Sequence, residues 1–363
     1  MKQIKTYRYK LKPTKDQAQQ LEQWLGVCRY IYNLTLDYKL TLWNHYKISV
    51  KLNDVQWELT RIAQETEWMK ALPAHVRQDA TNRVFIAFDK FFKEKKGFPR
   101  FARKNRYNSL TFPTHIKVNP DESVIQLPKI GLVKYHNHRP LKGTLKKITV
   151  IKEVNGWYAS LTVAEDIDYL PRIKTGIGID FGIRSVIIAS NGEKAENPKY
   201  TYQYEKKLAK LSRAVSRKKK GSSNQAKAAK KVARLQNRIS NSRLDYQHKL
   251  STKLIRENQT IALEDIRVNN FSSNRYLYKA LKDAAWGQLI RLIEYKAHWY
   301  GRTVIKVAPY NTSKTCSNCG HLNKEVHKAK YIWVCSACGA THDRDINAAV
   351  NIKNKAVGRT VSA

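Results

Sequence analysis

Four cysteines near the end of this chain constrain its fold more than any other feature. They form two pairs, Cys316-x2-Cys319 and Cys335-x2-Cys338, with fifteen residues between the pairs. A Cys-x-x-Cys turn presents two thiolates from one backbone bend, and two such turns complete the tetrahedral shell of Zn²⁺, whose bonds to sulfur are about 2.3 Å long. The spacing therefore predicts one structural zinc ion bound by these four residues.

Two disulfides are the alternative for these cysteines. The chain has five cysteines in all, the fifth is Cys28, and no other feature indicates an oxidising compartment. Zinc is therefore the favoured interpretation. Because four cysteines complete the shell, the neighbouring His321, His327 and His342 are predicted to lie at the surface or to contact the cysteines from outside the shell.

The net charge indicates a polyanionic partner. The chain has 68 Lys and Arg residues against 29 Asp and Glu residues, a formal charge of +39. Such a protein repels itself unless a polyanion is present. Nucleic acid is the predicted partner, with binding that weakens strongly as salt rises. Ribosomal and histone-like proteins share this charge, so charge alone does not indicate an enzyme.

No membrane or secretion segment is evident in the sequence. The N-terminal segment Met1 to Lys12 is charged and alternating, and no run of about 18 apolar residues occurs. We therefore expect a soluble, cytoplasmic protein without a membrane partner.

The N-terminal part of the chain favours a helical region inserted into a β domain. Residues 3–12 alternate like a strand, and Thr14-x-x-Gln17 is a capping box that opens a helix. Helical spacing continues to about residue 96. Beyond it, residues 110–163 contain short β-rich runs separated by turns, with a strong hairpin signal at Asn155-Gly156. This pattern predicts a small antiparallel barrel.

Acidic side chains occur at three places where predicted elements end or begin. Asp180 and Glu264 end apolar strands, where a carboxylate is costly unless it holds cations. Asp343-Arg344-Asp345 follows the cysteines and precedes a short helix over residues 346–357, and a helix start favours an ionised carboxylate. If these acids cluster, they can hold two divalent ions about 3.5 to 4 Å apart for phosphodiester cleavage. Mg²⁺ suits such a site because it needs few carboxylates.

Between the two strands lies a strongly basic segment. Residues 205–256 hold 17 basic residues against 2 acidic ones, on what the apolar spacing predicts to be one or two long helices. A solvated face is the alternative, but acidic partners for i,i+4 pairs are nearly absent, so phosphate contact is favoured. The candidate nucleic-acid-binding residues are Lys206, Lys207, Arg213, Arg217, Lys218, Lys219, Lys220, Lys230, Lys231, Arg234 and Arg238.

The order of short motifs along the chain is more specific than any one of them. In chain order they are Gly178-Ile179-Asp180-Phe181-Gly182, Leu263-Glu264-Asp265, Trp286-Gly287, Thr312-Ser313 before the cysteines, and Asp343-Arg344-Asp345-x-Asn347-Ala348-Ala349-x-Asn351. This order closely resembles the TnpB (OrfB) family of transposon-encoded RNA-guided DNA nucleases, which are related to type V CRISPR effectors. The resemblance spans the whole chain.

The resemblance implies an architecture with α/β, β-barrel and helical parts. It consists of an RNase H-like (RuvC) nuclease domain with an inserted zinc ribbon, and a wedge-type β-barrel interrupted by a helical recognition domain. The implied boundaries are residues 1–12 and 108–171 for the barrel, 13–107 for the helical domain, 172–310 and 341–363 for the nuclease domain, and 311–340 for the ribbon.

The family's catalytic acids fall on Asp180, Glu264 and Asp345 when the motifs are matched. Asp343 is the competing choice for the last acid, and Asp265 is expected to be a neighbouring structural acid. Gln78 matches a helical glutamine that contacts the target-adjacent motif in the family. The alternative for Gln78 is a solvated surface residue.

The implied function is RNA-guided cleavage of double-stranded DNA. A guide RNA from the transposon end pairs with one DNA strand beside a short target-adjacent motif, and one RuvC site cuts both strands. The implied cofactors are one Zn²⁺ and two Mg²⁺ ions, with Mn²⁺ as a substitute; monomer and dimer stay open. Two alternatives are a nuclease-dead RNA-guided repressor, which would have lost the acids, and a transposase that transfers DNA strands, for which no downstream tyrosine motif is evident.

Overall fold

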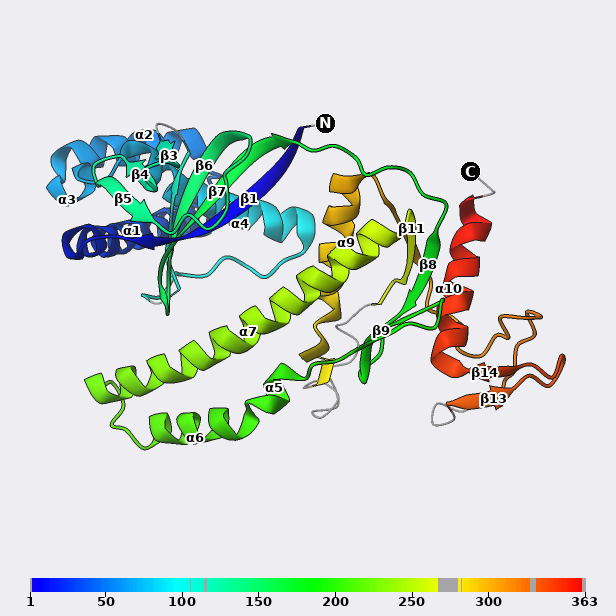
Figure 1. The fold of residues 1–363 in the computed structure, drawn as a ribbon. Helices are drawn as coiled ribbons and strands as arrows, with labels where there is room; N and C mark the ends of the chain where they lie inside the picture. Colours follow the sequence, from blue (N-terminus) through cyan, green and yellow to red (C-terminus); the bar gives the residue numbers. More distant parts are fainter. Residues whose placement is uncertain are drawn as a thin grey trace. The chain divides into compact units, whose positions relative to one another are not determined.

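The computed structural model describes residues 2–104, 106–113, 116–266, 280–281, 283–326 and 331–360. The chain divides into two compact units, residues 1–166 and 167–363. Each contains helices and strands, so the predicted mixture of α and β structure is confirmed (Figure 1). No helix in the described part of the chain is long and apolar enough to span a membrane.

The first unit begins as its sequence predicts. Strand β1 (Lys2–Lys12) leads into the long helix α1 (Lys15–Tyr46). The Thr14 hydroxyl accepts a hydrogen bond from the Gln17 amide (3.2 Å), and the Gln17 side chain accepts one from the Thr14 amide (3.1 Å), so the capping box is confirmed. The other elements of this unit are α2 (Leu52–Glu65), α3 (Glu67–Lys70), α4 (Ala74–Glu94), β2 (Ser109–Phe112), β3 (Lys117–Asn119), β4 (Val124–Leu127), β5 (Gly131–Tyr135), β6 (Thr144–Glu153) and β7 (Gly156–Asp166).

All strands of the first unit join one sheet. Their order is β2-β6-β7-β1-β5-β4-β3, and every recorded pairing is antiparallel. The predicted hairpin joins β6 and β7 at Gly156, whose positive φ of 125° suits glycine. Within the described residues β2 and β3 end the sheet without pairing to each other, so closure into a barrel stays a prediction.

The second unit is built on a mixed five-stranded sheet. Its strands are β8 (Gly176–Asp180), β9 (Ser185–Ala189), β10 (Lys194–Glu196), β11 (Thr260–Glu264) and β12 (Thr303–Val307), in the order β10-β9-β8-β11-β12. β8, β9 and β10 form an antiparallel meander, whereas β11 runs parallel to β8 and β12 parallel to β11. The remaining elements are α5 (Tyr200–Gln203), α6 (Glu205–Ser216), α7 (Ser223–Glu257), α9 (Trp286–Tyr300), β13 (Ile332–Val334), β14 (Thr341–Asp343) and α10 (Arg344–Thr360).

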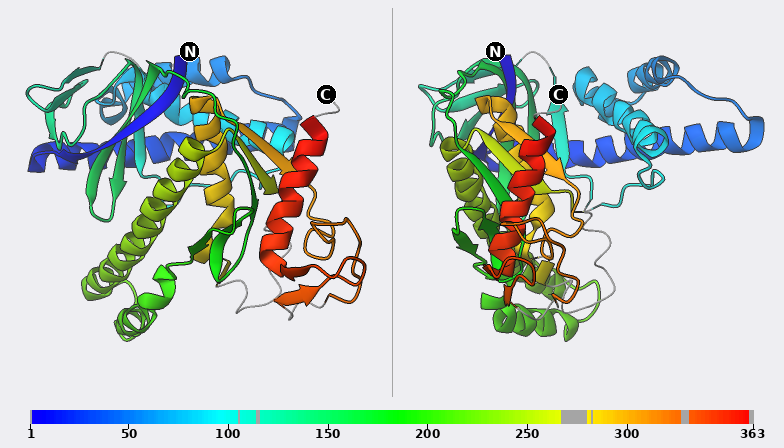
Figure 2. Two further views of the ribbon diagram at one scale, coloured as in Figure 1. Left: turned by 45° about the vertical axis from the view of Figure 1, so that its right-hand side comes forward. Right: turned by 90° about the vertical axis from the view of Figure 1, so that its right-hand side faces the viewer.

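Side-chain parity on the strands divides this sheet into two faces. On β8 and β11, Ile177, Ile179, Ile261 and Leu263 pack with α9 and the end of α7 into one core. The alternate residue Ala262 packs against Ile352 and Ala356 of α10. Figures 1 and 2 show α10 on the face of the sheet opposite α7 and α9. A strand residue that shares the parity of Ala262 therefore faces α10.

Gly178 allows α10 to lie directly on β8. A Cβ atom at this position would be 2.1 Å from the carbonyl oxygen of Ala349 and 2.7 Å from the amide nitrogen of Lys353, both in α10. Only glycine permits this approach of helix backbone to strand. The close contact brings the first turn of α10 to the end of β8.

Candidate active site

Adjacent strand ends bring Asp180 and Glu264 together. Asp180 is the last residue of β8 and Glu264 the last of the parallel strand β11, in a register that pairs Ile179 with Leu263. Neighbouring strands lie about 4.8 Å apart. Residues two positions apart on a strand point to the same face of the sheet. Asp180 lies two residues after Gly178, and Glu264 lies two residues after Ala262, so both carboxylates face α10.

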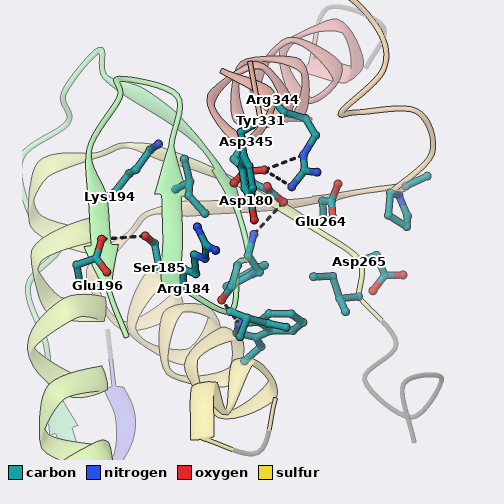
Figure 3. Close-up of a pocket in the computed structure, with 18 residues that line it drawn as sticks. Asp180, Arg184, Ser185, Lys194, Glu196, Glu264, Asp265, Tyr331, Arg344 and Asp345 are labelled. Atoms are coloured by element: carbon teal, nitrogen blue, oxygen red, sulfur yellow. Dashed lines mark hydrogen bonds and ion pairs between the residues drawn. The ribbon is translucent and has the colours of Figure 1, made fainter. Parts of the chain in front are cut away.

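Helix α10 brings the third acid to the same place. Asp345 lies in its first turn, and Figure 3 shows the side chain beside Asp180, with Glu264 close by. Nε and Nη2 of Arg344 donate to Oδ1 of Asp345 at 3.1 and 2.9 Å. The acids predicted from three separate segments therefore line one cleft.

Asp343, the competing acid, caps the helix instead. Its Oδ1 accepts hydrogen bonds from the amides of Asp345 (3.0 Å) and Ile346 (3.2 Å), and its Oδ2 accepts one from Nζ of Lys194 (2.7 Å). Partial burial alone would raise the pKa of Asp343, but these hydrogen bonds hold it below its usual value. Asp343 is thus occupied as an N-cap and ion-pair partner.

Burial and mutual repulsion make the acidic cluster costly in the absence of cations. Burial, followed by the charges of Glu264 and Asp345, raises the pKa of Asp180 from 3.8 to about 8, although the Phe181 amide and Arg344 act in the opposite direction. Glu264 is only 9% exposed. A shared divalent cation would relieve this repulsion, and carboxylate oxygens are the ligands that Mg²⁺ prefers.

The sequence pattern did not indicate three basic residues that also line this cleft of about 1140 Å³, namely Arg184, Lys194 and Arg344. The guanidinium groups of Arg184 and Arg344 each lie over the Tyr331 ring, at 5.3 and 5.0 Å from its centroid. Lys194 lines the cleft from β10. Arg184 and Arg344 lie close to Asp180 and Asp345 along the chain, whereas Lys194 lies farther along and carries no such signal. Asp265 also lines the cleft but is exposed and points away from the three acids (Figure 3).

The four cysteines lie together as their spacing predicts. Their Sγ atoms are all within 4.8 Å of one another, an arrangement that could hold a metal ion. The Sγ atoms of Cys316 and Cys338 are 3.7 Å apart, as are those of Cys319 and Cys335. These distances exceed a disulfide bond of about 2.05 Å and match the edge of about 3.8 Å expected for a tetrahedron with 2.3 Å bonds.

The histidines near the cysteines differ in their surroundings. Nε2 of His342 lies 3.0 Å from Sγ of Cys316, so this side chain contacts a cysteine from outside the four-sulfur cluster. His321 is exposed. His327 lies outside the described residues.

The basic segment forms two helices, α6 and α7. Ser222 caps α7 by accepting a hydrogen bond from the Gln225 amide (3.1 Å), and Leu235 and Ile239 are buried. Every basic residue named as a candidate in this segment is exposed. Gln78 lies on α4 in the first unit and is also exposed. The nucleic-acid contacts of all these side chains stay predictions.

Three family models match parts of the chain. The model described as "Probable transposase" matches residues 160–275, and the one described as "Cas12f1-like, TNB domain" matches residues 286–352. A model described as "Helix-turn-helix domain" matches residues 1–47, where the structure has β1 and the single long helix α1.

Curated relatives match almost the full length of the chain. Several carry the name "Putative RNA-guided DNA endonuclease". The one from Streptomyces pristinaespiralis is 34% identical and covers 97% of this chain and 89% of the relative. InsQ from Escherichia coli (strain K12) is 30% identical and covers 97% of this chain and 92% of the relative. Among solved structures, that of a Cas12f1–sgRNA–target DNA complex shares the fold, with a TM-score of 0.62 at 18% identity over 94% of this chain and 83% of that one.

Proposed function

This chain belongs to the TnpB family of RNA-guided DNA endonucleases, and from that premise we propose that it cuts double-stranded DNA beside a short target-adjacent motif. One active site would cut both strands in turn. The observation that carries the proposal is the convergence of Asp180, Glu264 and Asp345 on one cleft of the second unit. A nuclease-dead repressor would not need these acids, and they are all present.

The acidic cluster suits divalent metal ions. Two Mg²⁺ ions bound there, or Mn²⁺ in their place, would activate a water molecule and stabilise the leaving oxygen of the phosphodiester. Asp180, Glu264 and Asp345 would hold these ions, because their carboxylates line one cleft and the charges of Glu264 and Asp345 act on Asp180 when no cation is bound. Arg344, bound to Asp345, limits the negative charge of the cleft when no ion is present.

The proposed domains follow from the family resemblance. We assign an RNase H-like (RuvC) nuclease domain to the five-stranded sheet with α10, and a wedge-type barrel with a helical insertion to the first unit. The zinc ribbon is proposed for residues 311–340, with zinc as the metal because the sulfur separations fit a tetrahedral Zn²⁺ shell. Metal analysis of the purified protein should find about one zinc per chain, and Cys335→Ser should lose both the zinc and much of the folded protein.

The proposed partners are a guide RNA and duplex target DNA. Base pairing would supply sequence specificity, while exposed Lys and Arg side chains on α6 and α7 contact the phosphate backbone. Gln78 is proposed to contact the target-adjacent motif.

The test is cleavage of a plasmid by the purified protein bound to its guide RNA. With Mg²⁺ present, a supercoiled plasmid that carries the matched target and motif should become linear, and a plasmid with a scrambled target should not. Cleavage that is independent of the guide, or that persists in EDTA, would contradict the proposal.

A further inference from the structure

The carboxylate of Glu264 accepts a hydrogen bond from Thr312, a residue that has no role in the proposed cleavage reaction. The Thr312 hydroxyl donates a hydrogen bond to Oε1 of Glu264 at 2.7 Å. Both residues are buried, Glu264 at 9% and Thr312 at 5% exposure. Burial of a carboxylate costs free energy unless its oxygens accept hydrogen bonds or bind cations. The hydroxyl therefore fixes one oxygen of Glu264 and leaves the other available toward the cleft.

Thr312 is itself anchored to α10 by two buried asparagines. Nδ2 of Asn351 donates to the carbonyl oxygens of Thr312 (2.8 Å) and Thr315 (2.6 Å). Nδ2 of Asn347 donates to the same two carbonyls, at 3.4 and 2.8 Å, and its Oδ1 accepts from the Ser317 amide at 2.9 Å. Because Asn347 and Asn351 are four residues apart, they project from one face of the helix. Together these hydrogen bonds hold residues 312–317 against α10.

This network connects two catalytic acids through one helix. α10 carries Asp345 in its first turn and the two asparagines in the next turns. Through Asn351 and Thr312 the same helix determines where the Glu264 side chain lies. The segment 312–317 also contains Cys316, one of the four cysteines. The cysteine cluster is thereby joined to the position of Glu264 as well as to the start of α10.

We propose that Thr312 is a positioning residue that orients Glu264 for binding of a divalent ion, with Asn347 and Asn351 as its anchors. The inference rests on the proposed function only through the role given to Glu264. Hydrogen bonds that orient metal-binding side chains typically affect metal affinity or activity by about 10-fold to 100-fold when they are removed.

Thr312→Val tests this role because valine keeps the shape of threonine and removes the hydroxyl. We expect the single-turnover cleavage rate of the guide-RNA complex to fall at least about 10-fold, and the Mg²⁺ concentration for half-maximal rate to rise. Target binding should stay unchanged. Thr312→Ser restores the donor and should recover most of the rate. Thr303→Val, the same change at an exposed position on β12, serves as the control and should behave like wild type.

The outcomes separate this inference from the proposed function. A Thr312→Val protein with the rate and Mg²⁺ dependence of wild type would overturn the inference, and so would a Thr312→Ser protein as slow as Thr312→Val. If Thr312→Val lowers the thermal midpoint, Asn351→Leu provides a second measurement, because it removes an anchor of Thr312 and keeps the hydroxyl. This variant should also raise the Mg²⁺ concentration for half-maximal rate. If wild type does not cleave, the proposed function fails. Mn²⁺ binding followed by electron paramagnetic resonance then tests Thr312 directly, with weaker binding expected in Thr312→Val and equal binding contradicting its role.

Discussion

At the scale of single residues, two acids separated by one position have different surroundings. Asp343 caps α10 and pairs with Lys194 of β10, whereas Asp345 lies in the cleft beside Asp180. The sequence left both open as the last catalytic acid, because each lies next to a predicted helix start. What favours Asp345 is the position of β10, which supplies the lysine that engages Asp343, and no local pattern predicts that contact.

This difference predicts opposite effects of two matched substitutions. Asp343→Asn keeps a residue that caps helices as well as aspartate does, so it should lose only the exposed ion pair, worth about 0 to 1 kcal/mol, and should still cut DNA. Asp345→Asn should abolish cutting. Cleavage assays on both proteins check this, and an inactive Asp343→Asn beside an active Asp345→Asn would reverse the assignment.

The environment of Asp180 predicts how pH affects the metal-free protein. Its pKa is about 8 in the folded state against 3.8 ordinarily, so between these values the folded state binds a proton that the unfolded state releases. Stability due to this group is therefore present at low pH and is lost as pH rises toward 8.

Thermal unfolding in EDTA at pH 6 and pH 8 measures the effect. Asp180→Asn cannot titrate, so its thermal midpoint should exceed that of wild type by more at pH 8 than at pH 6. Added Mg²⁺ should raise the midpoint of wild type at pH 8 but not that of the variant. A pH-independent difference between the two proteins would argue against the raised pKa.

At the scale of elements, the approach of α10 to β8 determines the distance between the acids. Gly178 is the point of contact, since any side chain there meets the backbone of α10. Asp345 lies in the first turn of α10, so its side chain reaches the ends of β8 and β11 only if the helix lies close to the sheet. The proximity of the three acids thus depends on a glycine that lets the helix backbone approach the strand.

Gly178→Ala tests this dependence. The added Cβ would be 2.1 Å from the Ala349 carbonyl, so α10 must shift, and we expect a loss of about 1 to 3 kcal/mol in stability together with a large loss of cleavage. Gly287→Ala is the matched control, because a Cβ there meets nothing within 4 Å. Equal activity of the two variants would show that the contact does not position Asp345.

Regular elements were predictable from the sequence, and their contacts were less so. Apolar runs predicted the strands that end at Asp180 and Glu264, and the sequence predicted the helix that follows the cysteines. The capping box at Thr14 is confirmed. Local spacing could not predict the hydrogen bond from Thr312 to Glu264, which joins residues 48 positions apart. The motif containing Thr312 was recognisable, but its role depends on the path of α10.

At the scale of the whole molecule, the charge of +39 favours binding to a polyanion such as nucleic acid. The basic side chains on α6 and α7 are exposed, and some neighbours on α7 are already paired. Lys249 pairs with Asp245 at 2.7 Å and Lys253 with Glu193 at 2.9 Å. The candidate nucleic-acid-binding residues on α6 and α7 should therefore contribute more to phosphate binding than Lys249 and Lys253, whose charges are paired with carboxylates.

The salt dependence of RNA and DNA binding tests this ranking. Replacing Lys230, Lys231 and Arg234 by glutamine should reduce the slope of log K against log salt by about 2 to 3, since each phosphate contact contributes about 0.7 to 0.9. The double change of Lys249 and Lys253 to glutamine is the control and should alter the slope much less. Equal slopes for wild type and the triple variant would remove these residues from the interface.

The most direct test of the active site separates DNA binding from DNA cutting. Guide-RNA complexes of wild type, Asp180→Ala and Glu264→Ala are assayed in Mg²⁺ on one plasmid with a matched target, while target binding is measured by gel shift. We predict linear product from wild type only, with target binding retained by both variants. Continued cutting by both variants would contradict the three-acid site on which this account depends.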